Sequence, residues 1–238
     1  MAVAMGAGGC DSRSASSDPP TSKASPSASS SSSPAATDVA TQCKKFRRAT
    51  GPVAAEFGAA KVAAAECEMA VFTLEGSFLP KLMQATSFAK ADFAPFRAYM
   101  TPVARRAWDA DVAKVSRSGI RRRSALNAVA SITYVDITGH TYTLGNSRTS
   151  QPVSNRRLTS GRVRLVSVHG KRRLRLSLTM AFRLNLTERK SGRPVTVDGQ
   201  KSVAYTLVPN PGGKDKPFLI DGWRGRSRFG SVKAAAAP

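Results

Sequence analysis

Basic side chains gather in the second half of the chain, in a pattern that suits the binding of anionic groups. Eight of them form two clusters, which comprise Arg121, Arg122, Arg123, Lys171, Arg172, Arg173, Arg175 and Arg183. A guanidinium group donates paired hydrogen bonds to a phosphate or a carboxylate, and an ammonium group attracts either one as a point charge. Such clusters bind polyanions without a catalytic step, so the sequence predicts that these eight residues contact an anionic surface.

The second cluster lies in the segment KRRLRLSLTMAFRLNLT (171–187), whose pattern is that of a long strand. Every second residue from Leu174 to Leu186 is apolar, and the residues between them are polar or small. Since successive strand side chains point to opposite faces, one face of this strand is dry and the other is wet. Strands of this length belong to strongly curved antiparallel sheets. We therefore expect a core-forming strand whose outer face is basic.

The net charge of the whole chain favours an anionic partner. The chain holds 37 Lys and Arg against 15 Asp and Glu, and residues 117–238 alone hold 24 against 5. This excess indicates nucleic acid, acidic membrane lipid or an anionic cell-wall polymer. Nucleic acid is disfavoured, because the outer face of 171–187 has no aromatic residue on which bases could stack. The chain also has no recognition-helix motif and no zinc module.

The first 42 residues differ in composition from the rest. Residues 11–42 consist mostly of Ser, Ala, Pro, Asp and Thr, which bury too little apolar surface to fold, so they predict a disordered tether. Residues 1–10 end in Ala7-Gly8-Gly9-Cys10, which resembles the lipobox of a bacterial lipoprotein signal. The resemblance implies cleavage before Cys10, attachment of lipid to its thiol, and an extracytoplasmic protein anchored to the cell membrane.

The apolar stretch before Cys10 is short and contains no Lys or Arg, although a signal peptide begins with a charged region. We expect the true start of the protein to lie upstream of Met1, with the charged region and most of the apolar region encoded there. The alternative is an ordinary disordered N-terminus that contains one cysteine.

Cys43 and Cys67 form an even pair once Cys10 is set aside. An oxidising envelope permits a disulfide between them, which would close a loop of about 25 residues and stabilise the fold by about 3 kcal/mol in the chain-entropy description. The alternative is that Cys67 is a small core residue, because it lies on the apolar stripe of a predicted helix. No metal site or cofactor is expected, since the chain has neither a CxxC nor an HExxH motif.

The first half of the predicted domain is helical. An apolar period of three to four residues over 53–76 predicts a long amphipathic helix. Further helical stretches are expected over 77–86 and 93–100. Thr101 and Pro102 have the residue types of an N-cap and a first helical position, so another helix should begin there.

After residue 117 the apolar period changes from 3.6 to 2. Six strands are predicted, over 127–137, 140–144, 161–168, 172–187, 201–208 and 217–223. His169 and Gly170 mark a tight hairpin, whereas residues 187–201 should form a longer excursion between two strands. Helices followed by antiparallel strands predict an α+β domain with helices on one face of the sheet. This domain spans residues 43–230, and a disordered tail over 231–238 follows it.

Two motifs resemble the NTF2-like cone fold, in particular the tethered envelope domains of high-GC Gram-positive bacteria. They are FAPFRAYMTPVARRAWDADV (93–112), as a pair of short helices, and FLIDGW (218–223), as the final strand. The resemblance covers residues 54–229 and implies N-terminal helices packed on a curved antiparallel sheet. It bears on architecture more than on activity.

Some NTF2-like proteins are isomerases or dehydratases, in which an Asp or His base and Tyr donors face an apolar pocket. The candidates that the resemblance implies here are Tyr134, Asp136, His140, Tyr142, Tyr205 and Asp221. A carboxyl group inside such a pocket would have a raised pKa and could accept a proton. However, Asp136 and Asp221 stand near strand ends, where Asp serves turns, and the tyrosines suit half-buried strand positions. The sequence therefore favours a domain that is not an enzyme.

Together these features predict a membrane-tethered extracytoplasmic lipoprotein with a noncatalytic binding or structural domain. Its basic face is expected to lie against acidic membrane lipid or anionic cell-wall polymer, with an envelope protein as a further candidate partner. Two alternatives stay open, namely nonspecific binding of nucleic acid and an isomerase-type reaction inside the cone.

Overall fold

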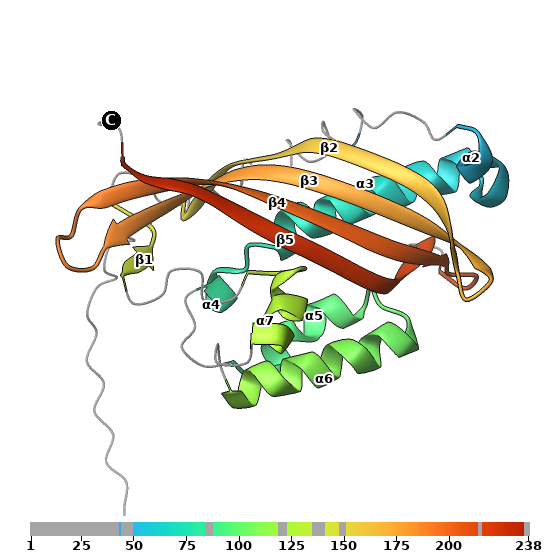
Figure 1. Cartoon of the computed structure of the whole chain (residues 1–238), viewed down its shortest axis with the longest axis horizontal. Helices are drawn as coiled ribbons and strands as arrows, with labels where there is room; N and C mark the ends of the chain where they lie inside the picture. Colours follow the sequence, from blue (N-terminus) through green and yellow to red (C-terminus); the bar gives the residue numbers. More distant parts are fainter. Residues whose placement is uncertain are drawn as a thin grey trace, which may run out of the picture. The chain divides into compact units, whose positions relative to one another are not determined.

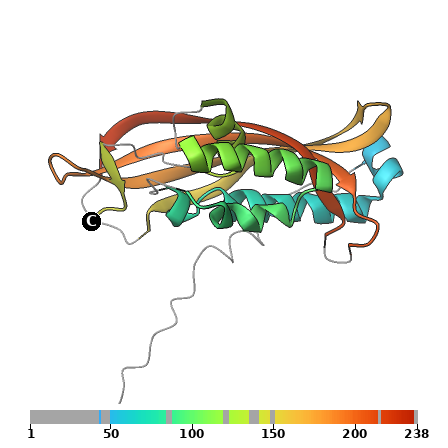
Figure 2. The ribbon, with the colours of Figure 1, turned by 90° about the horizontal axis from the view of Figure 1, so that it is seen from below.

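The structure is a computed structural model, and it describes residues 43, 50–83, 88–118, 123–134, 141–147, 151–213 and 216–235. The expected signal, the expected lipid-bearing Cys10 and the tether over 11–42 lie outside these residues. The helices of the described residues precede the strands along the chain, and they cover one face of an antiparallel sheet that curves around them (Figure 1, Figure 2). The predicted α+β class with a curved antiparallel sheet is therefore confirmed.

The helical half follows the predicted order, except that the single helix predicted over 53–76 is divided at Gly58, where φ is 81°. Its elements are α2 (Pro52–Phe57), α3 (Ala59–Gly76), α4 (Pro80–Met83), η1 (Lys90–Phe93), α5 (Ala94–Arg97) and α6 (Pro102–Ser118). Thr101 caps α6, because its Oγ1 accepts a hydrogen bond from the Ala104 N–H at 3.1 Å. The predicted N-cap is thus confirmed. Cys43 and Cys67 are joined by a disulfide, with their Cα atoms 4.9 Å apart, so residue 43 is linked to the middle of α3.

The strand predicted over 127–137 is wrong in its first part, where helix α7 (Arg123–Ala130) forms instead. Residues 135–140 lie outside the described part of the chain. Leu126 and Val129 are three residues apart and both face the core, which is the spacing of a helix and not of a strand. The helix also docks on the sheet, because Trp223 Nε1 donates a hydrogen bond to the Ala128 carbonyl at 3.0 Å.

The sheet consists of long antiparallel strands. They are β1 (Tyr142–Leu144), β2 (Val153–Val168), β3 (Lys171–Glu188), β4 (Pro194–Pro209) and β5 (Phe218–Ala234). The order is β1-β3-β4-β5, and β2 pairs with β3. The predicted tight hairpin between β2 and β3 is confirmed, since His169 and Gly170 have φ values of 49° and 74°, a combination that two-residue hairpin turns require and that glycine adopts readily.

Several predicted boundaries in the sheet are wrong, and β2 begins at Val153 and not at residue 161. The excursion expected over 187–201 is a short turn followed by β4, because Val195 and Val197 pair with Leu186 and Leu184 of β3 and become buried. The domain was expected to end at residue 230, but β5 continues to Ala234, which pairs with Val195. Residues 231–234 therefore belong to the sheet and not to a tail.

The apolar side of the sheet forms the core with the helices. All seven alternating apolar residues of β3, from Leu174 to Leu186, are buried. They divide between two clusters, one that includes Trp108 of α6 and one that includes Phe78 and Tyr134. Since this core occupies the concave side of the curved sheet, the other side is left to polar residues.

Candidate anion-binding face

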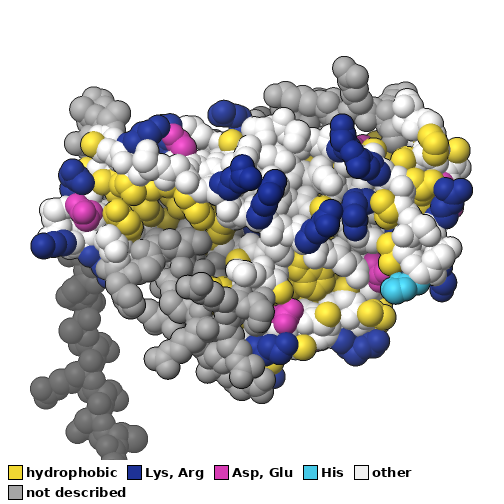
Figure 3. Space-filling view, in the orientation of Figure 1, with side chains coloured by type: hydrophobic (Ala, Val, Ile, Leu, Met, Phe, Trp, Pro, Cys, Tyr) yellow, Lys and Arg dark blue, Asp and Glu magenta, His cyan; other side chains and the backbone are white. Residues whose placement is uncertain are grey.

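The side of the sheet that points away from the helices carries most of the basic side chains of the strands. Residues between the buried positions of β3 point to this side, and the strand register extends the same alternation to β2, β4 and β5. Figure 3 shows Lys and Arg side chains spread over the strands. We call this surface the basic face, and its basic residues are Arg157, Arg162, Arg164, Lys171, Arg173, Arg175, Arg183, Arg224, Arg226, Arg228 and Lys233.

Some of these arginines are direct neighbours in the sheet. Arg164 lies opposite Arg175 across β2 and β3, and the guanidinium of Arg175 donates a hydrogen bond to Thr206 at 3.4 Å. Like charges directly opposite each other destabilise a sheet. The stability of the fold therefore does not explain this arrangement.

Two carboxylates on or beside the basic face neutralise only part of its charge. Asp198 lies 2.7 Å from Arg183 Nε and 3.4 Å from Lys233 Nζ, and the hydrogen bond from Arg183 lowers the pKa of that carboxyl. Asp221 accepts a hydrogen bond from Thr101 at 3.0 Å and lies 3.6 Å from Arg173 Nε. Within the described residues, the other eight basic side chains of the face have no ion pair.

The structure brings together only part of the predicted contact set. Lys171, Arg173, Arg175 and Arg183 lie on the basic face, as expected. Arg172 does not, because it points to the helix side and pairs with Glu56 of α2 at 3.6 Å. From the other predicted cluster, Arg121 and Arg122 lie outside the described residues. Arg123 begins α7 on the helix side, and its side chain is not described.

Seven basic residues of the face were missed by the sequence prediction. They are Arg157, Arg162, Arg164, Arg224, Arg226, Arg228 and Lys233. The signal for some of them is present in the strand pattern, because GRVRLVSV (161–168) alternates arginine with apolar residues. The arginines of β5 alternate with Gly225 and Ser227, which carry no apolar period, so that strand was expected to end at Trp223.

The candidate catalytic residues lie in separate surroundings. The Tyr205 hydroxyl is 2.9 Å from Thr73 Oγ1 in one core cluster, whereas Tyr134 packs against Phe78 and Phe182 in the other. Burial raises the pKa of both tyrosines. Asp221 lies on β5, where it accepts a hydrogen bond from Thr101, and Tyr142 lies on β1. Asp136 and His140 lie outside the described residues. The described candidates therefore do not face one common space.

Two buried ionisable groups were also missed. Lys201 of β4 is fully buried, and its Nζ donates hydrogen bonds to the Ile132 carbonyl at 2.6 Å and to Ser77 Oγ at 3.1 Å. Its Nζ also lies 4.5 Å from the centroid of the Tyr134 ring. A cation–π contact contributes about 0.5–2 kcal/mol, less than the several kcal/mol that burial of an ion costs, so burial dominates and lowers the pKa of Lys201 well below its usual value.

Glu66 of α3 is the second buried group. Only 3% of the residue is exposed, and its Oε2 atom has no hydrogen-bond partner among the described residues. Burial raises the pKa of this carboxyl to about 7. Both groups lie on the core side, so they do not contribute to the basic face.

No protein-family model, curated protein or solved structure matches this chain. None of the helices in the described residues has the length and apolar character needed to cross a membrane. The same residues contain no cluster of three His, Cys, Asp or Glu side chains that could hold a metal ion.

Proposed function

We propose that this protein is an extracytoplasmic lipoprotein, tethered through Cys10, whose NTF2-like domain binds phosphate groups through the basic face without catalysis. The observation that carries this proposal is the set of eight basic residues on the face that lack an ion pair within the described part of the chain. The phosphates belong to acidic membrane lipid or to an anionic cell-wall polymer, with which an anchored domain is in permanent proximity.

The spacing of the β5 arginines suits a ligand with repeated charges. Arg224, Arg226 and Arg228 occupy alternate positions of one strand, so they lie about 7 Å apart. Each basic residue near an acidic surface contributes about 1 kcal/mol, and salt screens this attraction. The proposal therefore requires multivalent, salt-dependent binding.

Nucleic acid is the second candidate, because its backbone presents the same phosphate chemistry. Among the described residues, the basic face displays no aromatic side chain on which a base could stack. Any binding of nucleic acid would therefore be driven by phosphate contacts and would not discriminate between sequences.

The test compares two triple variants that lose the same charge. Arg224→Gln, Arg226→Gln and Arg228→Gln remove it from the basic face, whereas Lys61→Gln, Arg106→Gln and Lys190→Gln remove it from exposed positions elsewhere. Binding of the full chain is measured on vesicles with and without phosphatidylglycerol, on poly(glycerol phosphate), and on duplex DNA of two sequences.

The face variant should weaken binding to phosphatidylglycerol vesicles or to the polymer by about 100-fold, as expected from about 1 kcal/mol for each of the three residues. The control variant should change it by much less. An equal loss of affinity in the two variants would mean that binding depends only on net charge, and it would reject the basic face as the binding site. Discrimination between DNA sequences at physiological salt would favour the nucleic-acid candidate.

The anchor is tested separately by Cys10→Ser in cells. The wild-type protein should fractionate with membranes and the variant with soluble proteins. Unchanged fractionation would reject the lipid anchor but would leave the binding activity of the face to be judged by the vesicle measurements.

A further inference from the structure

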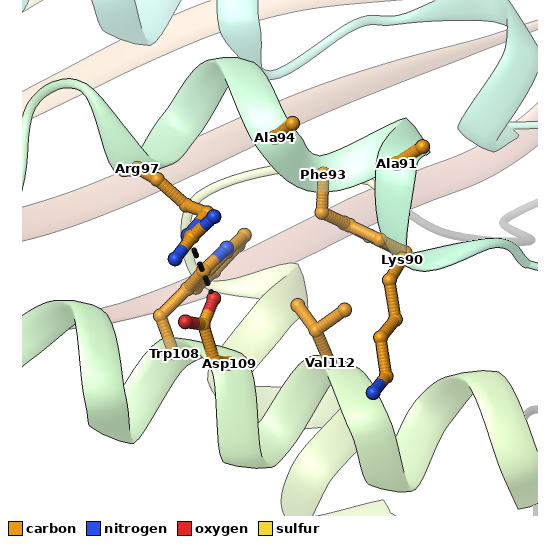
Figure 4. Close-up of a pocket in the computed structure, with 8 residues that line it drawn as sticks. All are labelled: Lys90, Ala91, Phe93, Ala94, Arg97, Trp108, Asp109 and Val112. Atoms are coloured by element: carbon orange, nitrogen blue, oxygen red, sulfur yellow. Dashed lines mark ion pairs between the residues drawn. The ribbon is translucent and has the colours of Figure 1, made fainter.

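A cavity of about 280 Å³ lies in the helical layer, away from the basic face, between the segment η1–α5 and helix α6. Figure 4 shows Phe93 and Val112 lining it from its two sides, with Lys90, Arg97 and Asp109 at its polar positions and the Trp108 indole beside the ion pair of Arg97 and Asp109. An apolar wall with a few polar groups is the usual composition of a small-molecule site.

Trp108 supplies the first indication of a ligand. The residue is fully buried, and its Nε1–H has no hydrogen-bond partner among the described residues. The other tryptophan, Trp223, satisfies the same group by donating to the Ala128 carbonyl at 3.0 Å. Buried indole N–H groups are normally paired, so an acceptor brought to this side of the cavity would satisfy the unpaired group.

The charges of the cavity define the class of ligand. Lys90 and Arg97 contribute two positive charges and Asp109 one negative charge, which leaves a net charge of +1 and matches a monoanion. Asp109 lies 3.0 Å from Arg97 Nε, but the two side chains are 44% and 47% exposed, so this ion pair is weak and can be replaced. A doubly charged phosphate would meet about twice the repulsion from Asp109 that a monocarboxylate meets, so the single negative charge is favoured.

We propose that this cavity binds a small organic monocarboxylate with an apolar body. The carboxylate lies between Lys90 and Arg97 and displaces Asp109 from the guanidinium. The Trp108 N–H then donates to the ligand, and Phe93 and Val112 pack against the apolar body. This site is separate from the basic face, so it does not depend on the function proposed above.

The experiment uses the full chain and the two indole N–H signals in an NMR spectrum, since the protein has two tryptophans. Trp223→Phe assigns the signals. Phenylacetate is the probe, and phenylacetamide, which has the same shape without the charge, is the control. The Trp108 signal should shift saturably with phenylacetate, by several times more than the Trp223 signal, and should hardly respond to phenylacetamide.

Variants then test the named contacts. Lys90→Gln and Arg97→Gln should each weaken phenylacetate binding by about tenfold or more, because each removes a charge-assisted contact. Val112→Phe should block binding by filling the cavity, and Arg106→Gln, which removes an exposed charge from the same helix, should leave it unchanged. The proposal is overturned if no saturable shift occurs at millimolar phenylacetate, if the amide binds as well, or if Arg106→Gln weakens binding as much as Lys90→Gln does.

Discussion

The buried carboxyl of Glu66 should make the stability of the domain fall as the pH rises. Burial raises the pKa of this group to about 7 in the folded protein, from an ordinary value of 4.5. Below pH 4.5 the carboxyl is protonated in both states, so it imposes no penalty. Between the two values only the unfolded chain releases the proton, and above pH 7 the folded protein holds a buried carboxylate.

The size of the effect follows from the two pKa values. A difference of one pKa unit corresponds to about 1.4 kcal/mol, so the free energy of unfolding should fall by up to about 3 kcal/mol between pH 4.5 and pH 7. Glu66→Gln removes this loss. The variant should match the wild type at pH 4.5 and should be more stable at pH 8 by about 2–3 kcal/mol, or roughly 4–12 °C in Tm for a domain of this size.

Urea denaturation followed by tryptophan fluorescence, with the disulfide intact, measures this difference at pH 4.5, 6 and 8. Glu75→Gln is the matched control, because Glu75 is an exposed carboxylate on the same helix. Its substitution should change stability little at any of these pH values. If the difference between Glu66→Gln and the wild type is the same at pH 4.5 and at pH 8, the reasoning about the buried carboxyl is refuted.

Two further substitutions test the packing of the sheet. Lys201→Met removes a buried amine whose pKa is lowered by burial, and Ser77 can still donate to the Ile132 carbonyl. Because the unfolded chain binds a proton at this amine more readily than the folded protein does, the stability of the variant relative to the wild type should rise as the pH falls from 10 to 6. A difference between the two proteins that does not change with pH in urea titrations would contradict this. Gly199→Ala places a methyl group against the buried ring of Phe182 and should destabilise the domain by about 2–4 kcal/mol in the same assay, whereas a neutral result would show that the ring can move.

Local pattern predicts the central strand of this fold well. The expected strand over 172–187 and the observed β3 (Lys171–Glu188) differ by one residue at each end, because seven alternating apolar residues leave no other period to choose. The strand predicted over 127–137 fails for the opposite reason. In its first part the apolar residues Ala128, Val129 and Ala130 are consecutive and do not alternate with polar ones, and contact with Trp223 from the far end of the chain favours a helix.

Long-range pairing accounts for what the local pattern missed in the sheet. Pro194 and Gly199 read as turn residues, yet the segment between them joins β4 because β3 supplies a partner along its whole length. The same pairing buries Lys201, which shares its side of β4 with Val203 and Tyr205. The alternation of β4 places residue 201 on the core side, but a charged side chain is normally expected on the solvent-exposed side.

The basic face was predictable in kind but not in extent. Arg173, Arg175 and Arg183 follow from the alternation in β3. Their meeting with Arg164 and Arg224 depends on the register between strands, which no single segment encodes. The sequence of one strand therefore predicts that the face is basic, but it does not predict how many basic residues the neighbouring strands add.

The link between Cys43 and Cys67 also determines how a pull on the N-terminal segment reaches the domain. Tension arriving at residue 43 passes through the sulfur bridge into the middle of α3, so the intervening chain bears none of it. The load enters on the helical layer and not along an edge of the sheet, where strands would separate one hydrogen bond at a time. Reduction of the bridge would reroute that force through residues 44–66 and should lower the force at which the domain begins to yield.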